Sequence, residues 1–278
     1  MQEELKEIPV PRYLSGQERS LTRPLYEKVF SEDTEKFVDY YYRYKIRDNQ
    51  ILVLEEDGQI VSMLHLNPYT MIVNGYELRS NYIVAVATLE AYRHRGYMRL
   101  LLEKALQDMA AQGMPFTFLM PVSESIYAPF DFVWICPHTE LPPRVERMNA
   151  DEQNRYLAAR YQMFCERDAC YMENIQAEHL AEAGEASTDK IPPYMARITD
   201  VCQMLSLVNS RKEQRLCLHI RDSIIEKNDG YFCWEVSPEG SFIEKLAEEP
   251  DHMDLELSVG ELTSMIFSEF RICLSEFV

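Results

Sequence analysis

The feature that most constrains the fold is a pair of hairpin turns in the first third of the chain. Asp57-Gly58 and Asn74-Gly75 each separate two runs of largely apolar residues. Such dipeptides favour two-residue turns between antiparallel strands, because both turn positions need a positive φ. The last run, Tyr82 to Ala87, is too short for a helix and suits the centre of a sheet. The strands are expected at residues 50–56, 60–73 and 82–87.

A different periodicity begins at Gly96. Apolar residues recur there at the three- and four-residue spacing that places them on one face of an α-helix. Gly113 and Pro115 end the pattern, and residues 116–120 predict a further strand before Pro121. The apolar stripe consists of Met98, Leu101, Leu102, Ala105, Leu106 and Met109.

The remainder of the chain has another character. The acidic stretch after residue 147 loses the turn-and-strand rhythm and predicts helix, up to a boundary at Pro192-Pro193. Strands at 216–220 and 231–236, with a capping box from Ser258 to Glu261, predict a second αβ unit. The expected class is α+β, with a mixed, mostly antiparallel sheet flanked by helices and a smaller αβ domain. The expected parts are residues 1–147, a helical connector at 148–190, and residues 191–278.

Composition excludes several function classes. The 278 residues carry a net charge of −18, which argues against nucleic acid as a partner. Such a charge would attract cations such as amines, although solubility alone is an equally good reason for it. No apolar run approaches the length of a membrane span, and the first 20 residues are too charged for a signal peptide, so a cytoplasmic location is expected. The seven scattered cysteines include no CxxC pair, so we expect reduced thiols and no metal site.

The run Arg93-His94-Arg95-Gly96-Tyr97-Met98 can carry chemistry, because it lies between a strand and a helix. The first amides of a helix lack internal partners and favour an anion such as a pyrophosphate. Gly96 allows close backbone approach, and the arginines would add charge-assisted bonds. The alternative is an ordinary solvated turn. Neither a GK[ST] phosphate loop nor a GxGxxG dinucleotide motif is present.

Val86-Ala87-Thr88, followed by Arg93 to Met98, resembles the cofactor motif of the GNAT N-acetyltransferases, (R/Q)xxGx(G/A). Met98, where a small residue is usual, and Arg99 resemble the enhanced-intracellular-survival (Eis) branch of that superfamily. Residues 123–132, SESIYAPFDF, resemble its SExxIYxxFGF segment, with Asp131 where glycine is usual.

Three later segments, residues 217–222, 228–230 and 254–259, resemble the sterol-carrier-protein-like domain of the same branch. The likeness thus covers roughly 15–140 and 190–278. The full-length family carries a second, degenerate GNAT domain between these parts. This chain is too short for it, and residues 148–190 look like its remnant.

The resemblance implies that acetyl-CoA is the co-substrate and lies between splayed strands at 82–88 and 116–120. Backbone N–H groups near Val86 to Thr88 would polarise its thioester carbonyl. The cofactor-binding residues implied are Val86, Ala87, Thr88, Arg93, His94, Arg95, Gly96, Tyr97, Met98 and Ser123.

The resemblance also implies two catalytic groups. The phenol of Tyr127 would return a proton to the CoA thiolate, and the C-terminal carboxylate of Val278 would act as the base. A carboxylate with a pKa of about 3.5 is a weak base for an ammonium near 10, so it would act through water or with its pKa raised by burial. The competing explanations are that Tyr127, one of 17 tyrosines, simply packs, and that the terminus frays in solvent.

Relatives grip their acceptor in the region of Tyr26, Glu27, Phe30 and Tyr41, whose aromatic faces and carboxylate suit a cation. An aromatic stripe at helical spacing is also common in protein cores. The expected function is acetyl transfer to a primary amine of a cationic small molecule, with a family tendency to form homo-oligomers. The alternatives are acetylation of a protein lysine or N-terminus, and an acyl-CoA or lipid-binding module without turnover.

Overall fold

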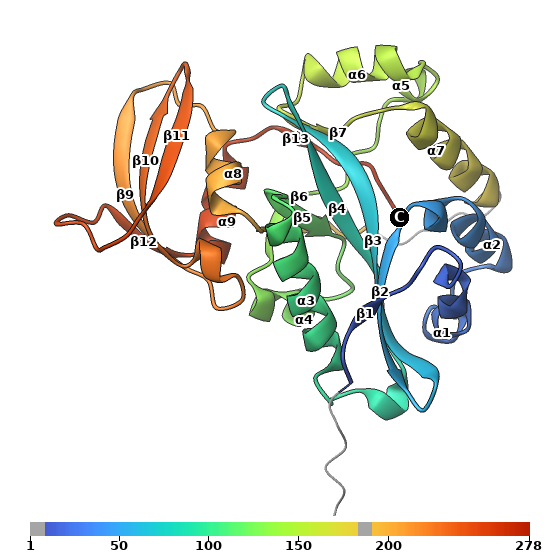
Figure 1. Ribbon diagram of the computed structural model, residues 1–278. Coiled ribbons are helices and arrows are strands. Elements are labelled where there is room, and N and C mark those ends of the chain that lie inside the picture. Colours follow the sequence, from blue (N-terminus) through green and yellow to red (C-terminus); the bar gives the residue numbers. More distant parts are fainter. Residues whose placement is uncertain (1–8, 183–190) are drawn as a thin grey trace, which may run out of the picture.

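The computed structural model describes residues 9–182 and 191–278, which form two sheets covered by helices (Figure 1). In the described residues the large sheet has nine strands, and only two of its strand pairs, β4–β5 and β7–β13, are parallel. The predicted mixed, mostly antiparallel sheet is therefore confirmed. Its order is β1 (Arg12–Tyr13), β2 (Gln50–Glu56), β3 (Gln59–Val73), β4 (Tyr76–Thr88), β5 (Phe116–Leu119), β8 (Tyr194–Ile198) and β6 (Val133–Cys136), with β7 (Met163–Cys165) on β3 and β13 (Ile272–Cys273) on β7.

Both hairpin turns are confirmed. Asp57 and Gly58 have φ values of 51° and 76° between β2 and β3, and Asn74 and Gly75 have 49° and 84° between β3 and β4. These are the left-handed conformations that a tight turn between twisted strands requires.

Helices cover both faces of the large sheet. α3 (Tyr97–Ala111) packs on β2, β3 and β4 through the predicted apolar stripe, of which Leu101 to Met109 are buried and Met98 is half-buried. α1 (Arg23–Val29), α2 (Glu35–Arg43) and α7 (Ala169–Glu182) lie on the other side (Figure 1). The sheet is thus buried on both faces, which explains the apolar character of β4 and β5.

The small domain is a four-stranded sheet in the order β11 (Gly240–Leu246), β10 (Gly230–Ser237), β9 (Gln214–Arg221) and β12 (Leu255–Ser258). α8 (Val201–Ser206) and α9 (Val259–Ser268) lie between it and the large sheet (Figure 1). The predicted capping box is present, because the Ser258 side chain accepts from the Glu261 N–H at 3.1 Å and Glu261 accepts from the Ser258 N–H at 2.7 Å.

The middle of the chain differs from the prediction. Helices α5 (Pro143–Glu146), α6 (Ala150–Ala158) and α7 occur, but β7 interrupts them and pairs with β3. The boundary drawn at residue 191 also falls before β8, which belongs to the large sheet. Both strands are three to five residues long, and so short an apolar run does not reveal which sheet it will join. Residues 183–190 of the predicted connector lie outside the described residues.

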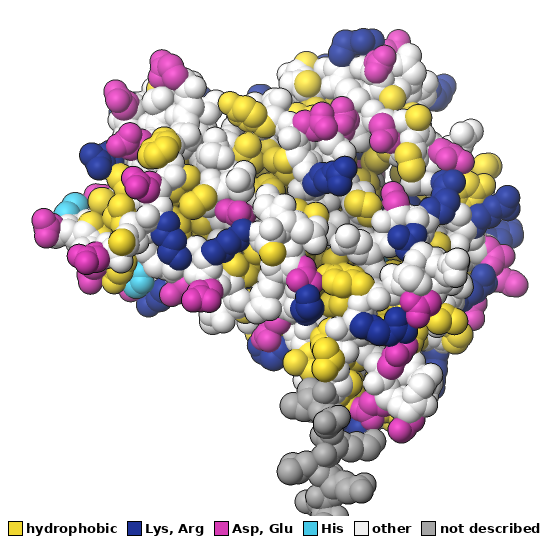
Figure 2. Space-filling view, in the orientation of Figure 1, with side chains coloured by type: hydrophobic (Ala, Val, Ile, Leu, Met, Phe, Trp, Pro, Cys, Tyr) yellow, Lys and Arg dark blue, Asp and Glu magenta, His cyan; other side chains and the backbone are white. Residues whose placement is uncertain are grey.

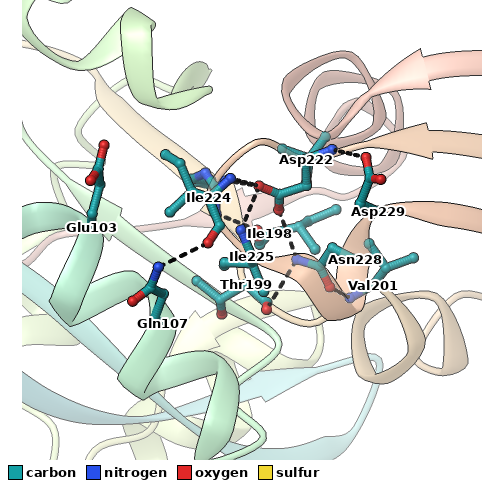
Figure 3. Close-up of polar contacts among 12 residues, drawn as sticks. Glu103, Gln107, Ile198, Thr199, Val201, Asp222, Ile224, Ile225, Asn228 and Asp229 are labelled. Atoms are coloured by element: carbon teal, nitrogen blue, oxygen red, sulfur yellow. Dashed lines mark hydrogen bonds and ion pairs between the residues drawn. The ribbon is translucent and has the colours of Figure 1, made fainter.

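A buried polar network fixes the small domain to the large sheet (Figure 3). Arg197 in β8 pairs with Asp222 at 2.6 Å, and both side chains are fully buried. Asp222 also accepts bonds from the Ile225 N–H at 3.0 Å and the Asn228 amide at 3.0 Å. From the other side, Gln107 in α3 donates to the Ile224 carbonyl at 3.1 Å. Asp222 therefore accepts bonds from the large sheet and from the small domain, and this buried pair joins the two.

Acidic and basic side chains are interspersed over the face seen in Figure 2, without a continuous basic surface there. None of the helices in the described residues has both the length and the apolar composition needed to cross a bilayer.

Candidate active site

The central opening of the large sheet lies between β4 and β5. The two strands pair only at Tyr82 with Phe118 and Ile83 with Leu119. Beyond Ile83, β4 continues along β3 as far as Thr88, while the chain leaves β5 through Met120 and Pro121. One edge of β4 is therefore left unpaired by β5 over the segment that contains Val86, Ala87 and Thr88.

A β-bulge distorts β4 at the start of this opening. His65 faces Val84 and Met63 faces Ala87, so two residues of β4, Ala85 and Val86, lie opposite one residue of β3. Ala85 has a φ of 49°, which is unusual for a residue with a side chain. A bulge leaves the extra residue out of the ladder and turns its backbone groups elsewhere. Such a group can donate a hydrogen bond to a thioester oxygen.

The turn before α3 has the geometry of an anion site. His94 and Gly96 have φ values of 62° and 81°, and Gly96 is the N-cap of the helix. The first intrahelical bond runs from the Leu100 N–H to the Gly96 carbonyl at 3.0 Å. The N–H groups of Tyr97 and Met98 precede it, so they have no intrahelical carbonyl to bond and can donate to an anion.

The arginines of this turn are exposed. Arg93 donates to the Thr88 carbonyl at 3.3 Å, which joins the turn to the end of β4. Arg95 donates to the Ala91 carbonyl at 2.9 Å. Ser123 lies after β5, where it is the exposed N-cap of α4 (Glu124–Tyr127). The predicted cofactor residues thus occupy the two strand ends that border the opening.

A cavity of about 170 Å³, here called the aromatic cavity, lies at the bulge. It brings together three of the four predicted acceptor residues with Val278. Glu27 is not among its lining residues and instead forms an exposed ion pair with Arg23 at 2.7 Å. The cavity is lined by Tyr26, Phe30, Tyr41, Tyr82, Ile83, Val84, Ala85, Met120, Phe277 and Val278.

Three tyrosines hold the C-terminal tail, residues 274–278, in this position. Tyr194 donates to the Glu276 carbonyl at 2.5 Å. Tyr82 donates to the Phe277 carbonyl at 3.2 Å, and Tyr69 to a Val278 oxygen at 2.7 Å. The tail therefore does not fray, since successive backbone oxygens are each bonded to a side chain of the large sheet. These tyrosines carry no distinguishing local pattern, so the sequence alone does not single them out.

Tyr127 is buried at the end of α4, and burial raises its pKa to about 12. Its ring packs edge-on against Phe132 with a centroid distance of 5.9 Å. Burial also raises the pKa of Tyr82, and the charges of Glu276 and Glu178 and the phenol of Tyr127 raise it further. Tyr82 lines the aromatic cavity whereas Tyr127 does not.

His65 on β3 is a buried imidazole that contacts Tyr41, a residue of the aromatic cavity. Its Nδ1 lies 2.9 Å from the Tyr41 hydroxyl. Burial lowers its pKa to about 3, so the ring is neutral and positions Tyr41 without contributing charge.

Comparisons with known proteins agree with this geometry. Residues 11–135 match the acetyltransferase (GNAT) domain family, and residues 201–273 match the sterol carrier protein domain family. No curated protein sequence matches the chain.

The fold is also similar to several solved structures. A probable N-acyltransferase from Enterococcus faecalis V583 is 14% identical, with 92% of this chain and 89% of that chain covered and a TM-score of 0.67. A GCN5-related N-acetyltransferase from Anabaena variabilis is 14% identical, with 93% and 90% covered and a TM-score of 0.63. Eis1 from Mycobacterium abscessus is 12% identical, with 94% and 89% covered and a TM-score of 0.61. At these identities the likeness concerns the fold.

The chain is thus an enzyme of the acetyltransferase class. Its N-terminal part is a GNAT acetyltransferase domain, followed by a sterol carrier protein domain, and acetyl-CoA is the acyl donor of this class. The predicted fold class, enzyme class and co-substrate are confirmed.

Proposed function

We propose that the enzyme transfers the acetyl group to a primary amine of a small cationic molecule. The observation that carries this proposal is the aromatic cavity, where Tyr26, Phe30 and Tyr41 meet the bulge of β4 and the end of the chain. Aromatic faces attract an ammonium group, and the net charge of −18 raises the local concentration of cations.

The residues have complementary roles in this proposal. The Val278 carboxylate takes the proton of the acceptor ammonium and frees the nitrogen lone pair for attack. A backbone N–H at the bulge donates to the oxygen on which negative charge develops. Tyr127 then gives its proton to the leaving sulfur. Its raised pKa keeps it protonated at neutral pH, as a general acid must be.

Arg93, Arg95 and the first amides of α3 hold the pyrophosphate in this proposal. They are supported by the positive φ of Gly96 and by the exposure of the turn. Val86 to Thr88 lie between this turn and the aromatic cavity along β4, which sets the direction of the bound donor.

A panel of amines with acetyl-CoA and a thiol-detecting reagent tests the function. The panel comprises an aminoglycoside, a polyamine, free amino acids and a lysine-containing peptide with a free N-terminus. The proposal expects fastest turnover with a cationic small molecule, and a KM that rises with ionic strength because salt screens the attraction. A neutral or anionic best acceptor, or a KM insensitive to salt, contradicts it, and a best acceptor peptide favours the protein-modifying alternative.

A second candidate function rests on a cavity of about 870 Å³ beside the small sheet. Leu216, Trp234, Val236 and Phe270 give it an apolar side, and Arg211 and Lys212 line it as well. Such a cavity suits a lipid with an anionic head. Turnover with any amine in the panel would rule out a lipid-binding module that lacks catalysis.

We further propose that the chain is a short relative of the Eis-type acetyltransferases. The likeness to the fold of Eis1 supports this relation. In this proposal α6, β7 and α7 replace the middle GNAT domain of the longer family members.

A further inference from the structure

Two side chains form a hydrogen-bonded path that leads away from the end of the chain. Tyr69 donates to a Val278 oxygen at 2.7 Å, and the Lys45 ammonium donates to the Tyr69 hydroxyl, also at 2.7 Å. Both residues line a second cavity of about 420 Å³, here called the polar cavity, and neither lines the aromatic cavity. Val278 lines both cavities, so the end of the chain lies between them.

Lys45 has an unusual environment for a lysine. Its side chain is buried, with 7% of the residue exposed. Within the described ranges, 9–182 and 191–278, its one hydrogen bond is to Tyr69, whose ring centroid also lies 4.6 Å from Nζ, and it forms no ion pair. A buried cation without a close carboxylate is costly, and an apolar side chain of similar length would fill the same space at lower cost.

Burial lowers the pKa of Lys45, although carboxylates on neighbouring elements oppose the shift. The neutral amine is therefore easier to reach than in an exposed lysine. The titratable groups that oppose the shift are Glu178 on α7, Asp48 in the loop before β2, Glu276 in the tail and Cys165 on β7.

A further buried polar residue lines the polar cavity. Asn67 lies two residues before Tyr69 on β3 and lines the same cavity. In the described part of the chain, neither polar atom of its buried amide has a protein partner. Buried amides are normally satisfied by water when protein groups do not reach them. The polar cavity is therefore a place where water can take up a proton from Lys45.

We propose that Tyr69 and Lys45 form a relay that carries the acceptor's proton from the Val278 carboxylate to water in the polar cavity. The inference rests on the proposed role of that carboxylate as the base. The carboxylate first takes a proton from the acceptor ammonium and becomes a carboxylic acid. Its O–H proton then passes to the Tyr69 oxygen while the Tyr69 proton passes to the neutral Lys45 amine. The Lys45 ammonium finally gives a proton to water, and the carboxylate and the amine are restored.

The base must lose its proton before each new turnover of the enzyme. A base that keeps the proton of one acceptor cannot serve the next, and the aromatic cavity is occupied by reactants and product during turnover. A path on the other side of Val278 lets the proton leave by a separate route. Tyr69 and Lys45 do not touch the reacting nitrogen, so they act through Val278.

Three substitutions separate proton transfer from placement of the tail. Lys45→Met removes the amine and keeps the length of the side chain. Lys45→Arg keeps the positive charge and the donor to Tyr69, but arginine does not give up its proton in proteins. Tyr69→Phe removes only the hydroxyl. The matched control is Tyr194→Phe, which also removes a tyrosine hydrogen bond to the tail but has no lysine behind it.

The readouts are kcat, its pH profile and its proton inventory in mixed H₂O and D₂O, with the best acceptor of the amine panel. Acetyl-CoA binding by calorimetry reports whether each variant is folded. We expect kcat to fall by about 10-fold to 100-fold in all three relay variants, since a general base contributes about 10²–10⁴-fold. The plot of kcat against the fraction of D₂O should change from curved in the wild type to linear in the variants, because several protons move together only in the intact relay. Tyr194→Phe should keep the curved inventory and the pH profile.

The outcomes are distinguishable. Wild-type kcat in Lys45→Arg overturns the relay and leaves Lys45 as a fixed charge, because arginine cannot pass the proton. A wild-type inventory in Tyr69→Phe or Lys45→Met overturns it as well. If a chain extended beyond Val278 keeps full activity, the base itself is wrong and the relay fails with it. If the extended chain is inactive while both Lys45 variants turn over normally, only the relay fails.

Discussion

Arg167 and Glu276 form an ion pair of 2.8 Å across 109 residues of sequence, and their side chains are 0% and 1% exposed. Tyr171 donates to the same Glu276 oxygen at 2.9 Å, and the Ser275 N–H donates to the other oxygen at 2.8 Å. Glu276 lies two residues before Val278. It therefore anchors the segment that brings the end of the chain to the aromatic cavity.

Arg167→Met should destabilise the protein by about 3–5 kcal/mol, because it leaves the Glu276 carboxylate buried without its partner. Urea denaturation measures the change in the free energy of unfolding. The double variant Arg167→Met/Glu276→Leu is the control, and it should recover much of the loss because no charge remains buried. A single variant as stable as the wild type would show that the pair does not anchor the tail.

The same pair predicts a pH dependence of stability. Burial alone would raise the pKa of Glu276, but Arg167, the Ser275 N–H and Tyr171 outweigh it, and the pKa lies below the ordinary value of 4.5. A carboxyl whose folded-state pKa is depressed stabilises the fold above its unfolded pKa, and this contribution is lost as the pH falls through the folded-state pKa. The free energy of unfolding should therefore decrease below about pH 4.5 more steeply in the wild type than in the double variant, as denaturation at several pH values can measure.

Adding a few residues after Val278 should lower kcat by about 100-fold or more, since it removes the proposed base. The affinity for acetyl-CoA should hardly change, because the phosphate turn lies at the other end of the opening. Steady-state kinetics and calorimetry measure the two quantities. The control carries the same added residues at the N-terminus and should keep its activity, whereas equal loss in both would point to a general effect of the added residues.

Gly96→Ala should weaken acetyl-CoA binding. Gly96 has a φ of 81°, so an alanine there strains the backbone. An added Cβ would meet no protein atom within 4 Å, so it would obstruct only a ligand that approaches the turn. Gly113→Ala is the matched control, because Gly113 has a φ of 74°, equally open surroundings and no role at the turn. Both variants should lose about 1–2 kcal/mol of stability, but only Gly96→Ala should bind acetyl-CoA less tightly in calorimetry. Equal affinities would exclude this turn as the phosphate site.

Tyr127→Phe should lower kcat by about 10-fold to 100-fold, because the leaving thiolate loses its proton donor. The pKa of Tyr127 is raised to about 12, so the phenol stays protonated until the pH approaches that value. The kcat profile between about pH 8 and pH 11 should therefore have the same shape in the variant and the wild type. Tyr76→Phe, at an exposed position in the second hairpin, is the control. A basic limb that disappears only in Tyr127→Phe would contradict the assigned pKa.

The parts of the fold that the sequence predicted are those set by local residues. Asp57-Gly58 and Asn74-Gly75 need left-handed backbone, so they mark the turns wherever they occur. The stripe after Gly96 and the box at Ser258 likewise depend on spacing within one helix. Three of the four residues predicted to hold the acceptor line one cavity with Val278.

The parts that it did not predict depend on distant contacts. The β-bulge at Ala85 results from the register shift between β3 and β4, which depends on both strands. An alanine in the sequence does not indicate a bulge. Tyr69 and Tyr194 hold the tail through contacts that span 209 and 82 residues. Glu27 was expected in the pocket because relatives hold their acceptor in this region and a carboxylate suits a cation. Instead it is exposed and pairs with Arg23 on its own helix.

The position of β13 has a consequence for how the chain folds. The chain leaves the large sheet after β8, builds the small domain, and returns to the large sheet at β13, so the small domain is a topological insertion. The first domain can complete its own sheet only after the second has been synthesised. Contacts of such long sequence separation slow folding, and a cut between the domains would remove a strand from the first. The first domain is therefore not expected to be recovered intact when it is expressed without the residues that follow the small domain.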